Sequence, residues 1–212
     1  MPNLLIVDDH SVVRTGLKLI IENFIPLAYI DEADDGDSAF EKIKHNQYDL
    51  IILDVTMPNT DSAGLISTIL SFKPKSKILM FSMNAEETYA KRYLKMGAMG
   101  YIRKDAPGTE IKKAITTVLN NKRYISEEMT ERLLGDMHGD STTQNPFDKL
   151  SPREFEILQH LILGEFPAEI CQKLKLHPST VGTHKSRIFE KLQCQNIIEL
   201  STLAKVNNII FN

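Results

Sequence analysis

The sequence predicts an α/β domain with a doubly wound (βα)5 arrangement, followed by an all-α domain of four helices. Two patterns support this prediction: short apolar runs alternate with helix-period stretches over the first 120 residues, and only helical periodicity remains from Leu150 onwards. The length of 212 residues suits two small domains. We place them at residues 1–121 and 149–212, joined by an extension and linker at residues 122–148.

Five short apolar runs are expected to form the strands of one parallel sheet. Helix-period stretches separate them, and the first helix presents one apolar face after Ser11, which we take as its N-cap. Strands that alternate with helices pair in parallel through right-handed crossovers, so helices cover both faces of the sheet. The predicted strands are Leu4–Val7, Tyr29–Ala33, Leu50–Asp54, Ile78–Ser82 and Gly100–Ile102.

The rest of the chain consists of a polar linker followed by a segment in which apolar residues recur only at helical spacing. A short helix is expected at Glu127–Leu134, and residues 135–148 are rich in Gly, Ser, Thr, Asn and Asp, which is typical of an exposed linker. Gly164 is a typical helix stop after the first of the four helices. These four helices are expected at Pro152–Leu163, Ala168–Leu174, Ser179–Leu192 and Ile197–Val206.

The composition argues against a membrane protein, a secreted protein and a disulfide-rich or zinc-binding protein. No apolar run reaches the roughly 18–20 residues of a membrane helix, and the first run is too short for a signal peptide, so we expect a cytoplasmic protein with no membrane partner. Two cysteines, Cys171 and Cys194, cannot form a disulfide framework or a zinc site by themselves. Residues 149–212 carry 8 basic and 6 acidic side chains, against 14 and 16 in residues 1–120. This balance permits nucleic-acid contact in the helical domain, although a net charge of +2 over 64 residues is also common on solvated surfaces.

Acidic side chains stand where strands of the predicted sheet end. Asp8 and Asp9 follow the first strand, and Asp54 ends the third. Ligands of an open parallel sheet bind beyond the carboxyl ends of its strands, and gathered carboxylates repel one another unless a cation compensates. Oxygen ligands favour Mg²⁺, beside which a carboxylate can attack phosphorus. Ser82 ends the fourth strand and Lys104 follows the fifth, and both would then hold the phosphoryl group.

Each of these residues has a simpler interpretation when it is taken alone. An Asp at a strand end is usually a turn residue, and a Lys after a strand is usually solvated. The five together, each at the correct end of the correct strand, favour the phosphoryl site.

Residues 1–120 resemble the receiver domain of two-component response regulators. The matching motifs are Ile6-Val7-Asp8-Asp9-His10, Leu53-Asp54-Val55-Thr56-Met57-Pro58, Phe81-Ser82-Met83 and Gly97-Ala98-Met99-Gly100-Tyr101-Ile102-Arg103-Lys104. The resemblance implies the flavodoxin-like receiver fold, with Asp54 as the phospho-acceptor and Ser82 and Lys104 on the phosphoryl oxygens. It also implies Mg²⁺ bound by Asp9, Asp54 and the backbone carbonyl of Thr56, with Asp8 acting through water.

Two further residues acquire meaning from this resemblance. Tyr101 matches the family's switch aromatic, which moves inward when Ser82 is drawn to the phosphate; taken alone, Tyr101 would be a half-buried strand aromatic. Ser62 stands where the family usually has a Gly in the turn entering the third helix, with Gly64 two residues later. We therefore expect a differently shaped loop at this turn.

Residues 150–206 resemble the LuxR-type helix-turn-helix domain of the NarL/FixJ class. The resemblance implies four helices, of which the third enters the major groove and the fourth serves dimerisation. The matching residues are Leu150-Ser151-Pro152-Arg153-Glu154, Gly164, Glu169-Ile170, Leu174, Thr180-Val181, His184, Ile188 and Lys191-Leu192.

The third helix combines a buried stripe with a polar face. Val181, Ile188 and Leu192 share the stripe, with His184 beside it. Short polar groups flanked by cations suit a groove lined by phosphates, although the same pattern without the helix-turn-helix context describes a solvated helix. The residues expected to contact DNA are Thr180, Thr183, Lys185, Ser186, Arg187 and Lys191.

The helical domain departs from its class at four positions. Gly182 and Ser186 stand where long basic side chains are common, so the face meant for DNA has few cations. Phe166 and His177 occupy positions of small polar N-caps, each before a proline suited to the first helical position. We expect weak DNA contact per monomer, which would make binding depend on dimers.

These inferences predict a response regulator. A sensor histidine kinase would phosphorylate Asp54 in a Mg²⁺-dependent reaction, which would switch homodimerisation and binding to a two-half-site DNA element and so regulate transcription. Such a chain accepts phosphate on itself and is not an enzyme. Two alternatives stay open: a protein-interaction switch that has lost DNA affinity, and a Mg²⁺-dependent phosphohydrolase with Asp54 as covalent nucleophile, although no second acid–base residue is evident beside it.

Overall fold

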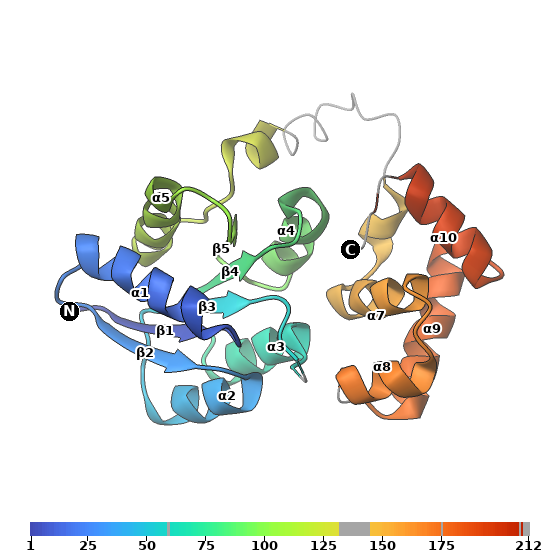
Figure 1. The fold of residues 1–212 in the computed structure, drawn as a ribbon, viewed down its shortest axis with the longest axis horizontal. Coiled ribbons are helices and arrows are strands. Elements are labelled where there is room, and N and C mark those ends of the chain that lie inside the picture. The colour runs from blue at the N-terminus through green and yellow to red at the C-terminus, as the bar shows by residue number, and fades with distance from the viewer. Residues whose placement is uncertain (59, 132–144, 175, 208, 210–212) are drawn as a thin grey trace. The chain divides into compact units, whose positions relative to one another are not determined.

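The computed structural model describes residues 1–58, 60–131, 145–174, 176–207 and 209 (Figure 1). The chain divides into two compact units, residues 1–134 and residues 135–212. No helix in these described ranges is long and apolar enough to cross a membrane.

A parallel sheet forms the centre of the first unit, as predicted. Within the described residues it has five strands in the order β2-β1-β3-β4-β5. The chain therefore changes direction across the sheet between β1 and β3, and ligands bind at such a switch point in open α/β sheets. The strands are β1 (Asn3–Val7), β2 (Tyr29–Ala33), β3 (Leu50–Asp54), β4 (Ile78–Ser82) and β5 (Gly100–Arg103).

Helices cover both faces of this sheet, which confirms the doubly wound arrangement (Figure 1). One face packs against α1 and α5 through an apolar core that includes Leu17, Ile21 and Ile115. The other face carries α2, α3 and α4. The helices are α1 (Ser11–Phe24), α2 (Gly36–His45), α3 (Ser62–Phe72), α4 (Glu86–Lys95) and α5 (Gly108–Leu119).

The start of α1 corrects the predicted cap. Ser11 is the first helical residue, and His10 before it is the N-cap, with extended backbone angles of φ −88° and ψ 109°. The side chain of His10 makes no capping hydrogen bond. It is therefore available to the acidic loop that precedes the helix.

The chain after α5 continues to pack on the first unit. Tyr124 is buried, forms an isolated β-bridge with Gly100 of β5 and donates its hydroxyl to Glu110 at 2.9 Å. A Cβ on Gly100 would lie 2.8 Å from the carbonyl oxygen of Tyr124, so glycine permits this close approach. The helix expected at Glu127–Leu134 is present over residues 127–131, and its last three positions lie outside the described residues.

The second unit is helical over its described residues, as predicted. The last part of the predicted linker belongs to it, because Phe147 is buried and residues 146–149 form a 3-10 helix; residues 135–144 of that linker are outside the described part. Gly164 follows the C-cap Leu163 with φ +82°, the left-handed conformation that stops α7. The helices are η1 (Pro146–Lys149), α7 (Pro152–Ile162), α8 (Pro167–Lys173), α9 (Pro178–Leu192) and α10 (Ile197–Val206).

Candidate functional site

The sheet brings the predicted acidic residues together. Val7 of β1 pairs with Leu53 of β3, so the chain segments that leave the two strands start side by side. Asp8 follows directly after β1, and Asp54 is the last residue of β3. Both side chains are buried, with 1% and 2% of their surface exposed. Two carboxylates thus lie in the interior at the switch point, where an unpaired charge is costly.

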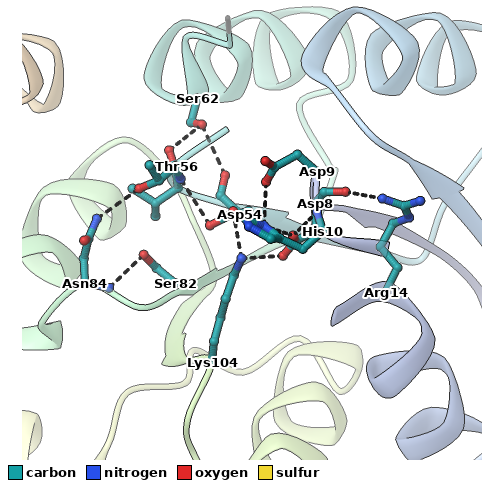
Figure 2. A network of polar contacts seen from close by, with 11 residues as sticks. Asp8, Asp9, His10, Arg14, Asp54, Thr56, Ser62, Ser82, Asn84 and Lys104 are labelled. Carbon is teal, nitrogen blue, oxygen red and sulfur yellow. Dashed lines mark hydrogen bonds and ion pairs between the residues drawn. The ribbon is translucent and has the colours of Figure 1, made fainter. Parts of the chain in front are cut away.

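Lys104 compensates these two carboxylates. Its ammonium lies 2.6 Å from an Asp8 oxygen and 2.8 Å from an Asp54 oxygen (Figure 2). The Lys104 side chain is itself only 9% exposed, which strengthens the electrostatic attraction relative to a surface pair. Asp8 and Asp54 are 46 positions apart in the sequence, and Asp54 and Lys104 are 50 apart, so the fold brings the three residues into contact.

The pocket changes the titration of its charged groups. Burial raises the pKa of Asp54 to about 6, although the Lys104 ammonium and the Thr56 amide oppose this rise. Burial would lower the pKa of Lys104, but its hydrogen bonds to Asp54 and Asp8 outweigh burial, so that pKa is raised. Lys104 is therefore a permanent cation at neutral pH, and Asp54 is a carboxylate whose charge is costly to keep.

The pocket also presents a set of metal-ligating atoms. Oxygen atoms of Asp8, Asp9 and Asp54 and a ring nitrogen of His10 all lie within 4.8 Å of one another. The Thr56 amide donates to the other Asp54 oxygen at 3.1 Å, which places residue 56 beside the pocket, as predicted. Sequence reasoning missed His10, although an imidazole directly after two aspartates was a usable signal.

Two hydrogen bonds from α1 brace the first loop of the pocket. Arg14 donates one guanidinium nitrogen to the Asp8 carbonyl at 2.7 Å and another to Glu32 of β2 at 3.0 Å. Figure 2 shows Arg14 on the side of Asp8 away from Asp54. Arg14 was not among the predicted residues, because its role depends on how α1 turns over the end of β1.

Ser62 fills the place where the receiver family usually has glycine. Its side chain is fully buried at the start of α3, and its hydroxyl contacts the carbonyl oxygens of Val55 at 2.7 Å and of Asp54 at 3.2 Å. The hydroxyl therefore ties α3 to the backbone that carries Asp54 and Thr56 (Figure 2). Glycine at this position could not make these contacts, and the differently shaped loop itself stays a prediction.

The predicted switch residues form a second network beside the acids. The Ser82 hydroxyl accepts a hydrogen bond from the Asn84 amide at 3.1 Å, and the Asn84 side chain donates to the Thr56 hydroxyl at 3.3 Å. Tyr101 is fully buried, donates its hydroxyl to the Asn84 carbonyl at 3.0 Å and stacks on Tyr93 with 6.5 Å between ring centroids. The structure thus holds Tyr101 in an inward position, and burial raises the pKa of its phenol.

The third helix of the second unit has the two faces that the sequence predicted. Val181 and Ile188 are fully buried and Leu192 is 6% exposed, while Gly182 and Arg187 lie on the exposed face. Of the residues expected to contact DNA, four are exposed and two are half-buried. The exposed ones are Thr183, Ser186, Arg187 and Lys191, and the half-buried ones are Thr180 and Lys185.

Several of these side chains are engaged within the protein. The Lys191 ammonium lies 2.6 Å from Glu154, a buried acid of α7 that also accepts the Ser151 amide at 2.8 Å. The hydroxyls of Thr183 and Ser186 donate to helix carbonyls four residues earlier, at 2.8 and 3.1 Å. Of the other predicted long cations, Lys185 lies over the Phe189 ring with 5.9 Å from its ammonium to the ring centroid, and Arg187 makes no hydrogen bond or ion pair with the described residues.

The two unusual N-caps are partly compensated. The Phe166 amide donates to Glu169 at 2.7 Å, which supplies half of a capping box for α8. His177 accepts the Ser179 amide on its Nδ1 at 3.4 Å and contacts the Ser179 hydroxyl at 2.8 Å. An imidazole thus takes the place of a small polar cap at the start of α9.

Two family models cover most of the chain. A model described as the response regulator receiver domain matches residues 4–116, and a model for bacterial regulatory proteins of the LuxR family matches residues 148–204. The first spans the whole pocket from β1 to α5, and the second spans all helices from α7 to α9 and most of α10.

Known proteins resemble the chain over nearly its full length. The oxygen regulatory protein NreC of Staphylococcus carnosus (strain TM300) is 37% identical over 204 residues, which cover 93% of this chain and 94% of NreC. The response regulator UvrY of Escherichia coli (strain K12) is 31% identical over 204 residues, with 96% and 94% covered. RcsB from Salmonella enterica serovar Typhimurium, solved on the P1flhDC promoter with the phosphomimetic BeF3⁻, shares the fold with a TM-score of 0.72 at 23% identity, covering 97% of this chain and 98% of that chain.

Proposed function

The chain belongs to the NarL/FixJ class of response regulators, which join a receiver domain to a LuxR-type DNA-binding domain, and from this premise we propose how its residues divide the work. Asp54 accepts a phosphoryl group from a sensor histidine kinase. The phosphorylated receiver then controls homodimerisation and DNA binding by the helical unit, and so regulates transcription.

The observation that carries this proposal is the buried Asp54 carboxylate in contact with the Lys104 ammonium at 2.8 Å. A bond forms between an Asp54 oxygen and phosphorus while the bond from phosphorus to the donor nitrogen breaks. Lys104 stabilises negative charge on the phosphoryl oxygens, because a desolvated ammonium is a strong hydrogen-bond donor to them. The same pocket holds the product on the protein itself, so the chain receives phosphate and does not turn over external esters.

The donor set of the pocket fits Mg²⁺. Hard oxygen ligands from Asp9, Asp54 and the Thr56 carbonyl would hold the ion, with Asp8 acting through water. Bound there, Mg²⁺ supplies neutralisation of charge on the phosphoryl oxygens. Asp8 and Asp54 are too buried to remain both charged without cations, and Lys104 alone provides one positive charge for the carboxylates.

Ser82 and Tyr101 connect the phosphoryl group to the protein surface. The Ser82 hydroxyl turns from the Asn84 amide toward a phosphoryl oxygen on Asp54, which adds about −1.5 to −2 charge and strong acceptors to the pocket. Tyr101 already donates to the Asn84 carbonyl, so a movement of the Asn84 segment is transmitted to the buried ring. The two networks therefore act as one local switch.

DNA binding is assigned to the exposed face of α9. Arg187 is the principal cation of this face, and Thr183, Ser186 and Lys185 lie beside it. One monomer with so few cations releases few counterions on DNA and binds weakly. A dimer on two half-sites combines two weak contacts through effective concentration, which makes phosphorylation-dependent pairing the control point.

The decisive experiment measures binding to a random double-stranded DNA pool at low and moderate salt. Full-length protein is compared with and without beryllofluoride and Mg²⁺, with Asp54→Asn as the control. We expect beryllofluoride to strengthen binding in the wild-type protein only, with selected sequences that contain paired half-sites. Binding that is equal in both states and in Asp54→Asn would contradict phosphorylation control.

Two observations favour a second output, which is binding of a protein partner. Lys191 is paired with Glu154, and Gly182 supplies no side chain, so two positions of the DNA-facing helix contribute little to a phosphate contact. If beryllofluoride changes the oligomeric state but no DNA is bound at low salt, the helical unit serves a protein partner instead. The same titration therefore separates the two outputs.

A further inference from the structure

We propose that the short helix at residues 127–131 is a conformational readout of phosphorylation, docked on the receiver through Glu86 and released when Asp54 carries a phosphoryl group. This inference rests on the proposed function, because it requires phosphorylation of Asp54 and the switch at Asn84. It adds the element that carries the change out of the receiver, since the chain runs from this helix toward the second unit.

The segment that precedes the short helix is anchored on β5 and α5. The Tyr124 amide donates to the Met99 carbonyl at 2.9 Å, and the Tyr124 carbonyl accepts the Tyr101 amide at 3.2 Å. The Tyr124 side chain is buried, and its hydroxyl donates to Glu110 of α5 at 2.9 Å. Three hydrogen bonds and burial thus hold Tyr124, and all three partners lie outside α4.

The short helix, in contrast, is tied to the first turn of α4. Glu86 begins α4 and is buried, and its carboxylate accepts the Ser126 amide at 2.9 Å. Ser126 in turn starts the short helix, because its hydroxyl accepts the Met129 amide at 3.1 Å and its carbonyl accepts the Thr130 amide at 3.0 Å. Met129 is buried in this docked position. A helix of five residues is too short to persist by itself in water, so docking maintains it.

The chain itself links Glu86 to the phosphorylation switch. Asn84 lies two residues before Glu86, and its amide donates to the Ser82 hydroxyl at 3.1 Å. When that hydroxyl turns to a phosphoryl oxygen, the Asn84 amide loses its acceptor and the start of α4 is free to shift. A shift of about 1 Å along the bond from Ser126 to Glu86 would lengthen it beyond the limit of about 3.5 Å for a hydrogen bond.

The two parts of this segment should therefore respond differently. Tyr124 is held by the main chain of β5, which the parallel sheet fixes, whereas the Ser126 amide is held by a side chain of α4. The ion pair between Lys113 and Glu127, at 2.9 Å, joins two exposed side chains and contributes little to docking. Loss of the Glu86 contact thus frees the short helix and leaves Tyr124 in place.

The test measures amide hydrogen exchange residue by residue, by nuclear magnetic resonance. Full-length protein is compared with and without beryllofluoride and Mg²⁺. The amides of Ser126 and Thr130 report on the short helix, that of Tyr124 reports on the anchor, and that of Asn84 reports on the switch. The wild-type protein alone can therefore decide the inference, whatever the stability of the variants.

Three variants test the role of the Glu86 carboxylate. Glu86→Met keeps a side chain of similar length and removes the acceptor for the Ser126 amide. Glu86→Gln retains one carbonyl acceptor, so it should restore docking if the hydrogen bond is what matters. Glu87→Met is the matched control, since Glu87 is an exposed acid in the same helical turn.

We expect beryllofluoride to speed exchange of Ser126 and Thr130 about tenfold or more in the wild-type protein, while Tyr124 changes less than about threefold. Glu86→Gln and Glu87→Met should behave like the wild-type protein. Glu86→Met should exchange rapidly at Ser126 and Thr130 in both states.

The outcomes separate this inference from the proposed function. If Asn84 responds to beryllofluoride but Ser126 and Thr130 do not, or become slower, the short helix is no readout and the receiver switch stands. Equal acceleration of Tyr124 and Ser126, or slow exchange of Ser126 in Glu86→Met without beryllofluoride, would also overturn the inference. If Asn84 does not respond at all, the switch of the proposed function fails and the inference fails with it.

Discussion

The acidic pocket of the first unit and the exposed face of α9 in the second differ in how their side chains are held. Asp54 is buried and the Lys104 side chain is 9% exposed; the two contact each other directly, and each has a second partner that fixes it. Arg187 and Ser186 on α9 are exposed, and the Ser186 hydroxyl binds the helix itself. The departures from the family pattern at Gly182 and Ser186 fall on the exposed face.

This difference follows from the loss of stability that a substitution causes in each of the two regions. Removing one partner from a buried charge pair leaves an uncompensated charge in the interior. Replacing an exposed side chain usually changes stability by less than about 0.5 kcal/mol. Sequence motifs therefore predict the residues of the pocket more closely than they predict those of the DNA-facing surface.

The largest expected effect comes from a substitution that tests whether Lys104 binds the phosphoryl group in the pocket. Lys104→Met should slow phosphorylation of Asp54 by acetyl phosphate about 100-fold, because one desolvated donor to the phosphoryl oxygens is lost. The measurement is the initial rate of phosphoprotein formation, followed by intact mass. Lys113→Met on α5 is the matched control, since that side chain is 61% exposed and its ammonium forms an ion pair only with Glu127 among the described residues. A rate within about threefold of wild type would remove Lys104 from phosphoryl binding.

The next effect concerns stability and its pH dependence. The pKa of Asp54 is raised from 3.8 to about 6, so the protonated carboxyl favours the folded state. That contribution is present below about pH 4 and is lost as the pH rises through about 6. In metal-free protein at pH 8, Asp54→Asn should therefore increase the free energy of unfolding of the first unit by about 1–3 kcal/mol.

Hydrogen exchange of the β3 amides in EDTA measures this change. The gain should be large at pH 8 and should nearly vanish at pH 4, where the wild-type carboxyl is already protonated. A loss of stability in Asp54→Asn at pH 8 would mean that the ion pair with Lys104 outweighs the burial of the charge.

A third prediction separates structural from DNA-binding cations on α9. Lys191→Met should lower the stability of the second unit by about 1–3 kcal/mol, because Glu154 keeps its burial and loses its cation. Burial would raise the pKa of Glu154, but Lys191 and Ser151 outweigh it, so that pKa is lowered. The contribution of the pair is thus present above pH 4.5 and is lost as the pH falls through the lowered pKa.

Arg187→Ala is the counterpart of Lys191→Met. It should leave stability unchanged and reduce the slope of the logarithm of DNA affinity against the logarithm of salt concentration by about 1. Urea unfolding and salt titration of both variants decide the assignment. If Lys191→Met reduces the salt slope as much as Arg187→Ala does, Lys191 contacts phosphate and its pairing with Glu154 is secondary.

The smallest expected effect comes from Gly182. A Cβ added at this position would meet no atom within 4 Å, so alanine fits without displacement. Gly182→Ala should stabilise the second unit by about 0.5–1 kcal/mol, since glycine loses more backbone entropy in a helix. Thermal unfolding measures the gain, and an unchanged or lower melting temperature would show that glycine is needed there for another reason.

The positions of the strands and of the pocket residues could be predicted from two features of the sequence, which are the short apolar runs and their alternation with helix-period stretches. Apolar runs of five residues identify the buried strands, and parallel pairing requires their carboxyl ends to meet, which brought Asp54 and Lys104 together. The contacts of Ser62 and Arg14 could not be predicted. They depend on the path of loops after β3 and β1, and no periodicity specifies a loop path.

The second unit shows the same limit. The buried stripe of α9 was predicted from its spacing and is confirmed by the burial of Val181 and Ile188. Lys191 was predicted to contact DNA because it flanks the polar face; its ammonium lies 2.6 Å from Glu154 in the structure, and its contact with DNA stays a prediction. A flexible side chain at the border of two faces can reach either one, and only tertiary structure decides between them.

The contact between Lys191 and Glu154 has a consequence for the thermodynamics of recognition. It joins the last turn of α9 to the first turn of α7, where Glu154 also accepts the Ser151 amide. The orientation of α9 within its unit is therefore settled during folding, and little conformational entropy remains to be lost on the duplex. Most of the binding free energy that the few cations supply then contributes to DNA affinity, because little of it is offset by the ordering of α9.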